Sequence, residues 1–124
     1  MSGDLSPHFW ASEFACNCGK CEYSTDPQMN PRLIDALEEL RDEFGKPVTV
    51  NSGRRCAAHN KAVGGAPGSQ HLLGNAADIR ISGVRPGDVA TAARTVDAIR
   101  GIGWYKTFTH VDVRDAARVE WDYR

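Results

Sequence analysis

Residues 69–81 read Ser-Gln-His-Leu-Leu-Gly-Asn-Ala-Ala-Asp-Ile-Arg-Ile, and the alternation in the second half of this stretch decides the fold. From position 76 onward, Asp78 alternates with the apolar residues Ile79 and Ile81. A period of two indicates a β-strand whose isoleucines enter a core while the carboxylate faces the other way. His71 stands seven residues before Asp78, on a segment that changes from turn to strand.

A second alternating run, Thr-His-Val-Asp-Val-Arg, occupies residues 109–114. In a strand, His110 and Asp112 share one face while the two valines share the opposite face. If the two runs pair as antiparallel strands, His71 and Asp78 come together with His110.

Two imidazole nitrogens and one carboxylate oxygen suit zinc, and three protein ligands with a fourth position left for water make the open, catalytic form of a zinc site. We therefore predict a Zn²⁺ site formed by His71, Asp78 and His110. The alternative for any single pair is a buried histidine that is hydrogen-bonded to an aspartate.

Size and composition restrict the class of protein. The 124 residues predict one domain, 1–124, and the net charge of -1 argues against duplex nucleic acid or an anionic membrane as a partner. No stretch is apolar for long enough to span a bilayer. Because residues 1–4 are followed by no apolar run, we expect no secretory signal.

Four cysteines allow several interpretations. The spacing Cys16-x-Cys18-x-x-Cys21, with Cys56 far downstream, suits a structural metal bound by thiolates. A disulfide from Cys16 or Cys18 to Cys56 is an alternative, and free buried thiols are another. None of these interpretations makes the cysteines catalytic.

Helix signals are strongest at residues 31–44, where apolar residues recur every three or four positions between Asn30, a helix N-cap, and Gly45, a helix end. Other elements are expected as strands at 48–52 and 76–81, a loop at 54–68, a helix at about 88–99, a turn at 101–103, a hairpin of 104–105 with 108–113, and a terminal strand or coil within 115–124. The pattern predicts an α+β domain with a small, mainly antiparallel sheet and helices packed on one side.

The pattern Ser69-x-His71-x-x-Gly74-x-Ala76-x-Asp78, with an x-His-x-Asp strand about thirty residues on, resembles the zinc peptidases of peptidoglycan. That family includes bacterial D-alanyl-D-alanine carboxypeptidases and phage L-alanyl-D-glutamate endopeptidases. The resemblance also covers residues 9–16, 50–56, Asn60 with 63–65, and 101–105. It implies the fold shared with the hedgehog signalling domain, so fold and metal alone do not prove catalysis.

The resemblance also implies roles for side chains outside the metal ligands. Arg55 matches the arginine that holds a substrate carboxylate or polarises the scissile carbonyl, and its neighbour Arg54 is then expected to face solvent. Ser69 either binds substrate or caps the turn that it begins.

The general base is the point at which the sequence departs from the family. The resembling enzymes carry an acidic residue a few positions before the last histidine, where this chain has Thr107 and Phe108. Asp112 is the nearest carboxylate, and it would either shuttle a proton or hold a histidine ring and pair with Arg80 or Arg114. Glu13 and Glu120 are more distant candidates.

These observations together predict a zinc peptidase of the D,D-carboxypeptidase or L,D-endopeptidase type that cleaves stem peptides of the bacterial cell wall. Its relatives without a signal peptide look like phage enzymes, so we expect a protein that is cytoplasmic until release or associated with a virion and other virion proteins. The alternative is a non-catalytic, zinc-stabilised binding or structural module, such as a phage tail component.

Overall fold

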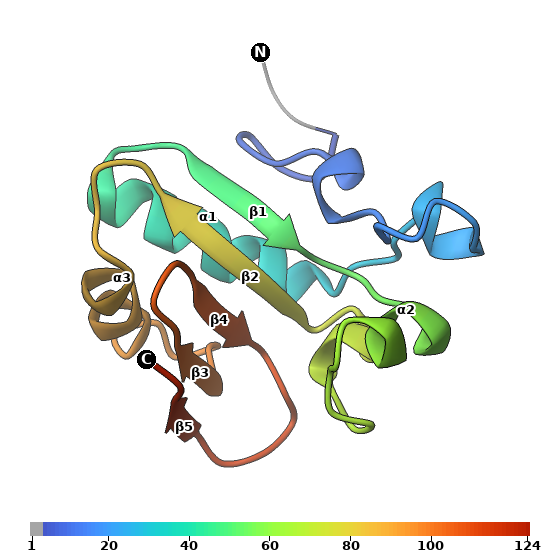
Figure 1. Cartoon of the computed structure of the whole chain (residues 1–124). Helices are drawn as coiled ribbons and strands as arrows, with labels where there is room; N and C mark the ends of the chain where they lie inside the picture. The colour runs from blue at the N-terminus through green and yellow to red at the C-terminus, as the bar shows by residue number, and fades with distance from the viewer. Residues whose placement is uncertain (1–3) are drawn as a thin grey trace.

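A five-stranded sheet forms the centre of the computed structural model, which describes residues 4–124 (Figure 1). Its strands lie in the order β1 (Val48–Ser52), β2 (Ala76–Ile81), β4 (Thr109–Asp112), β3 (Gly101–Trp104) and β5 (Val119–Asp122). Three neighbouring pairs are antiparallel, and β3 with β5 is parallel. The predicted α+β fold is confirmed, with a mixed sheet whose only parallel pair in the described residues lies at one edge. Residues 1–3, on which the prediction of no signal peptide partly rests, lie outside the described residues.

Helix α1 (Pro31–Phe44) has the predicted bounds. The side chain of Asn30 accepts a hydrogen bond from the backbone nitrogen of Arg32 at 3.0 Å and so caps the first turn. Gly45 ends the helix with φ +61°, a left-handed conformation that glycine adopts without strain. These local signals explain why the sequence alone predicts this helix.

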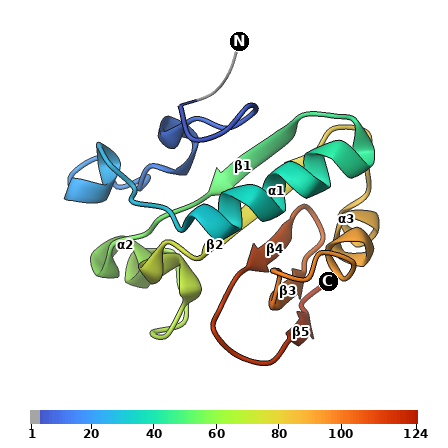
Figure 2. The same ribbon diagram turned by 180° about the vertical axis from the view of Figure 1, so that it is seen from behind.

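The core lies between the sheet and the two longer helices, α1 and α3 (Pro86–Ala93). Figure 2 shows α1 crossing in front of β1 and β2. Ile79 belongs to the buried cluster that the sheet shares with α1. Burying each large aliphatic side chain contributes about 1.5–3 kcal/mol. Because side chains alternate along a strand, the same packing turns Asp78 to the opposite face, which the helices leave open.

Helix α3 begins at Pro86, slightly before the predicted helix at about 88–99, and ends early, at Ala93. It is therefore shorter than predicted. Val96 and Ile99 are buried as expected, but they lie in tight turns that follow the helix. The guanidinium of Arg118 donates to the backbone oxygens of Arg94, Val96 and Ile99. An arginine from a distant segment thus satisfies carbonyls that a continued helix would have used.

Two further predictions about local structure are wrong. The predicted loop at 54–68 contains α2 (Ala57–Ala62), whose first turn is capped by the sulfur of Cys56 accepting from the backbone nitrogen of His59. The predicted turn at 101–103 belongs to β3, where Gly101 leaves room for the carboxylate of Asp112. The longest helix, α1, has 14 residues, and none of the helices within 4–124 has the length and apolar character of a membrane span.

Candidate metal centre

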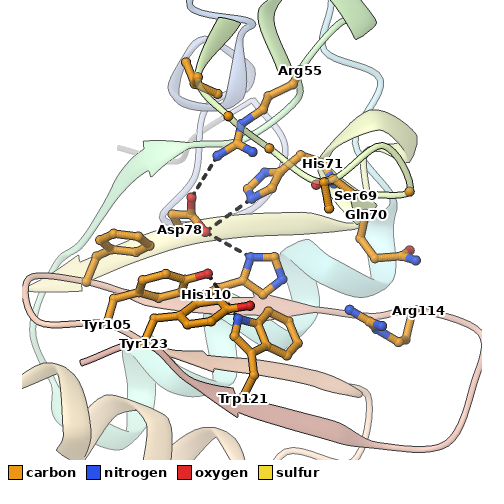
Figure 3. Close-up of a pocket in the computed structure, with 16 residues that line it drawn as sticks. Arg55, Ser69, Gln70, His71, Asp78, Tyr105, His110, Arg114, Trp121 and Tyr123 are labelled. Atoms are coloured by element: carbon orange, nitrogen blue, oxygen red, sulfur yellow. Dashed lines mark hydrogen bonds and ion pairs between the residues drawn. The ribbon is translucent and has the colours of Figure 1, made fainter. Parts of the chain in front are cut away.

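Three different elements bring the predicted ligands together on the open face of the sheet (Figure 3). Asp78 on β2 and His110 on β4 are directly opposite each other in the antiparallel pair. His71 lies on a short 3-10 helix, η3 (Gln70–Leu73), which ends at Gly74 with φ +74° before the chain enters β2. The left-handed turn at Gly74 folds the imidazole back over the strand that carries Asp78.

The ligand atoms have the spacing that a metal ion requires. Oδ1 of Asp78 lies 3.2 Å from Nε2 of His71 and 3.0 Å from Nδ1 of His110. Donor atoms bound tetrahedrally to zinc at about 2.0–2.1 Å lie roughly 3.3 Å apart. Side chains that are each at least nine-tenths buried therefore already stand near the separations of a bound triad. The residues present fit the metal that the sequence predicts.

Each histidine ring also forms a hydrogen bond through the nitrogen that faces away from Asp78. Nδ1 of His71 donates to the carbonyl oxygen of Gly53 at 2.7 Å, and Nε2 of His110 donates to Oδ2 of Asp112 at 2.8 Å. These bonds fix which ring nitrogen carries a proton, and they leave Nε2 of His71 and Nδ1 of His110 directed at Asp78. Such outer partners are typical of histidines that bind metals.

The charges of the site are strongly coupled. Burial opposes the charged form of Asp78, but its close contacts with His110 and His71 outweigh burial and hold the pKa of Asp78 below its usual range. Burial likewise opposes a charged His110, yet its bonds to Asp112 and Asp78 raise its pKa. The two carboxylates thus favour a positive charge between them, which a proton or a metal ion can supply.

Asp112 lies behind His110 rather than in the cavity. Its side chain is 0% exposed and accepts two hydrogen bonds at 2.8 Å from the guanidinium of Arg114. These bonds and the bond from His110 outweigh burial and keep the pKa of Asp112 low. Arg80, the other predicted partner, bonds Asn51 instead. Of the two predicted roles, the geometry favours the holding of a histidine ring.

Arg55 lies at the centre, as the resemblance implies. Its guanidinium donates to Oδ2 of Asp78 at 3.1 Å, to Oγ of Ser52 at 3.1 Å and to Oδ1 of Asn60 at 3.2 Å. Its side chain is only 14% exposed. Its backbone nitrogen donates to the carbonyl oxygen of His71 at 3.0 Å, which couples the arginine to the ligand-bearing segment.

Arg54, by contrast, does not face solvent, so that expectation is wrong. Its guanidinium lies 3.8 Å over the ring of Tyr23 and donates to the backbone oxygens of Pro27 and Gln28. A planar cation on an aromatic face is a packed arrangement that ties the amino-terminal segment to the end of β1.

A cavity of about 570 Å³ opens over the three ligands. Ser69 lies on its wall, and the Oγ atom of Ser69 also accepts from the backbone nitrogen of His71 at 3.2 Å, as the predicted cap would. The cavity also has an aromatic wall and two flanking polar side chains that were not predicted from the sequence, which are Tyr105, Phe108, Trp121, Tyr123, Gln70 and Arg114. Two signals could have indicated part of this wall, the aromatic pair Trp104 and Tyr105 after Gly103 and the alternation of Trp121 with Tyr123.

Carboxylates are scarce around the cavity. Among residues 4–124, Asp78 is the only acidic side chain that lines it. Glu13 accepts from the backbone nitrogen of Trp10, and Glu120 pairs with Arg94 on the outer surface. Neither candidate therefore replaces the acidic residue that the sequence lacks before His110.

The fold and the centre define an α+β domain with a metal-binding site, and comparison with known proteins gives the family. A model of the family described as Peptidase M15 matches residues 7–112, and the chain therefore belongs to this family. The matched range contains every predicted metal ligand.

The sequence of the chain is similar to those of two named peptidases. It is 48% identical over 44 residues to the zinc D-Ala-D-Ala carboxypeptidase of Streptomyces albus G, a match that covers 35% of this chain and 17% of that protein. It is 33% identical over 97 residues to the peptidoglycan L,D-endopeptidase MepK of Escherichia coli K12, which covers 71% of this chain and 53% of MepK. The chain thus spans about half the length of MepK and less of the carboxypeptidase.

Proposed function

We propose that the chain is a zinc peptidase that hydrolyses peptide bonds in the stem peptides of bacterial peptidoglycan. One observation carries the proposal: three buried ligand atoms converge at the floor of an open cavity, and each imidazole is fixed from behind. Membership of the Peptidase M15 family and the activities for which the two relatives are named support it. A bound zinc ion supplies a Lewis acid that polarises a carbonyl and activates water at neutral pH.

The two arginines at the cavity suit a substrate with carboxylates, such as a stem peptide. A guanidinium has five N–H donors. Arg55 uses three of them on Ser52, Asn60 and Asp78, which leaves two for a substrate oxygen. Arg114 directs Nε and Nη2 at Asp112, which leaves Nη1 beside the cavity.

The aromatic side chains form a rigid wall beside the ligands. Tyr105 stacks on Phe108 with ring centroids 4.3 Å apart, and Nε1 of Trp121 donates to the hydroxyl of Tyr105 at 3.0 Å. Because these rings hold one another in place, they can position an extended peptide at low entropic cost. The wall therefore supports binding of a peptide longer than a single residue.

A second candidate function is a metal-stabilised module that binds peptidoglycan or a phage structure without cleaving it. The observation that favours it is the single carboxylate among the described residues that line the cavity, because hydrolysis also needs a group that transfers a proton. The proposed route to the cell wall, by release from a cell or within a virion, stays a prediction.

Digestion of purified peptidoglycan tests the two candidates. We expect the zinc-loaded chain to release fragments with new amino termini. Mass analysis of the fragments distinguishes carboxypeptidase cleavage, which frees D-alanine, from endopeptidase cleavage. His71→Ala should abolish release, and His8→Ala, which alters an exposed histidine paired with Glu38, should not. Retention of the chain on peptidoglycan of several chemotypes without any fragment would support the binding module instead.

A further inference from the structure

Four cysteines from two distant segments meet on the side of the molecule where the amino-terminal segment packs against the end of β1. Cys16, Cys18 and Cys21 lie in the turns between two short 3-10 helices, η1 (Ala11–Phe14) and η2 (Glu22–Ser24), and Cys56 is the N-cap of α2. All four Sγ atoms lie within 4.8 Å of one another. This group is separate from the centre formed by the two histidines and Asp78.

The distances between the sulfur atoms match a metal site. Sγ of Cys56 lies 3.9 Å from Sγ of Cys16 and 3.9 Å from Sγ of Cys18. Thiolates bound tetrahedrally to zinc at about 2.3 Å lie roughly 3.8 Å apart. A disulfide would draw only two sulfur atoms together, to about 2.05 Å. One metal ion at the middle of the four sulfur atoms explains all of their positions. Disulfides would not, because each joins only two sulfur atoms.

Hydrogen bonds to the sulfur atoms suit charged thiolates. The backbone nitrogens of Lys20, Cys56 and His59 donate to Sγ of Cys18, Cys16 and Cys56 at 3.3, 3.5 and 3.4 Å. The hydroxyl of Ser24 lies 3.6 Å from Sγ of Cys18 and 3.7 Å from Sγ of Cys21, and it donates its proton to the carbonyl oxygen of Cys16. Backbone N–H donors directed at sulfur in this way stabilise negative charge on it.

Cys16 is buried, so a thiolate at this position would need a cation beside it. A divalent ion at the middle of the cluster would supply that cation for all four sulfurs.

We propose that Cys16, Cys18, Cys21 and Cys56 bind a second, structural Zn²⁺ ion. Each thiol that becomes a ligand releases one proton, and four zinc–sulfur bonds replace four S–H bonds with no change in oxidation state. All four coordination positions are filled by protein, which is the closed form of a structural site. Formation of the site needs no oxidant, unlike formation of a disulfide.

The site would also hold the segment that leads into the metal centre. Cys56 directly follows Arg55, which bonds Asp78, and the backbone nitrogen of Arg54 donates to the carbonyl oxygen of Phe14 at 2.9 Å. Gly53, one residue earlier, accepts the hydrogen bond from His71. A metal ion that joins Cys56 to the amino-terminal segment therefore fixes one end of residues 53–56, the segment that supports His71 and Arg55.

Native mass spectrometry of the full chain, purified with zinc and a reductant, tests the proposal without any assay of activity. We expect two zinc ions in the wild-type chain, one in His71→Ala, one in Cys18→Ser/Cys21→Ser, and none when the changes are combined. His71→Ala leaves every cysteine in place, so its remaining zinc reports on the cluster even if the serine variant fails to fold.

Substitution with cobalt identifies the ligands of that remaining ion. His71→Ala loaded with Co²⁺ should show the intense near-ultraviolet absorption of thiolate-to-cobalt charge transfer. A His71→Ala chain with no zinc ion, or a denatured mass two hydrogens lower for each disulfide, would overturn the proposal. Because these readouts concern the cysteines alone, their failure is distinct from a failure to cleave peptidoglycan.

Discussion

The Nε2 atom of His110 lies 2.8 Å from Oδ2 of Asp112, two residues further along the same strand. The opposite ring nitrogen, Nδ1, lies 3.0 Å from Oδ1 of Asp78. His110 is thus held between two carboxylates, one of which faces the cavity while the other is completely buried. Asp112 acts on the centre through the ring of His110, which makes it a positioning residue in this geometry.

Asp112→Asn should therefore weaken zinc binding at the histidine centre by about 10–100-fold, the usual cost of losing an outer partner of a metal ligand. An amide accepts more weakly from His110 and places N–H groups against Arg114. Competition with a chelator measures the affinity. Asp122→Asn is the matched control, because Asp122 pairs in the same way with Arg124, two residues on, at the surface. Unchanged affinity with a lower kcat at saturating zinc would instead support the proton-shuttle role.

Arg55→Lys should raise KM for a stem-peptide substrate and lower kcat/KM by at least about tenfold. A lysine ammonium cannot reach Ser52, Asn60 and Asp78 together, and each lost hydrogen bond to a charged group costs about 1.5–3 kcal/mol. Steady-state kinetics on a purified muropeptide measures the effect. Arg80→Lys, an exposed arginine with one bond to Asn51, should leave the kinetics unchanged. Equal effects of the two variants would contradict the substrate role of Arg55.

Gly101→Ala should destabilise the fold and weaken the histidine centre together. A Cβ atom at this position would overlap the carboxylate of Asp112, so that group must shift from Arg114 and His110. Overpacking of this kind costs about 1–3 kcal/mol. Thermal unfolding with and without zinc measures both effects. Gly87→Ala, where the new atom would meet Trp104 at an ordinary 3.5 Å, should be neutral, and similar losses in both variants would contradict the argument.

Local signals were enough to predict α1, β1, β2 and the pair His71 and Asp78, whereas His110 joins them only through the pairing of β2 with β4. A capping Asn30, a terminal Gly45 and the alternation around Asp78 each act within a few residues, so the sequence displays them directly. The ligand pattern was readable for the same reason, because His71 and Asp78 occur in one short stretch.

Features that depend on distant partners were not predictable in this way. Helix α3 stops early because Arg118 binds the following carbonyls, and Arg54 is packed because Tyr23 lies beneath it. The aromatic wall depends on the parallel pairing of β3 with β5, which brings Trp121 beside Gly103. No local sequence pattern indicates which residues of β3 and β5 lie side by side. The lack of a second carboxylate among the residues of 4–124 that line the cavity likewise depends on the position of Asp112, which no local pattern indicates.

Glu38 holds the amino-terminal segment on α1. Its carboxylate accepts from the hydroxyl of Ser6 at 2.6 Å and from the backbone nitrogen and ring of His8 at 2.8 and 2.7 Å. Burial raises the pKa of Glu38, but these hydrogen bonds outweigh it and lower the pKa below its ordinary value.

A lowered folded-state pKa means that the carboxylate stabilises the fold above the unfolded-state pKa, about 4.3, and that this contribution is lost as the pH falls through the folded-state value. Glu38→Gln should therefore reduce the free energy of unfolding by about 1 kcal/mol at neutral pH, and the difference from wild type should shrink as the pH falls below about 4. Denaturant unfolding at several pH values measures it. Glu43→Gln, at an exposed position on the same helix, should show no such trend. A difference for Glu38→Gln that grows toward low pH would mean that the carboxylate is destabilised in the fold, contrary to its bonds with Ser6 and His8.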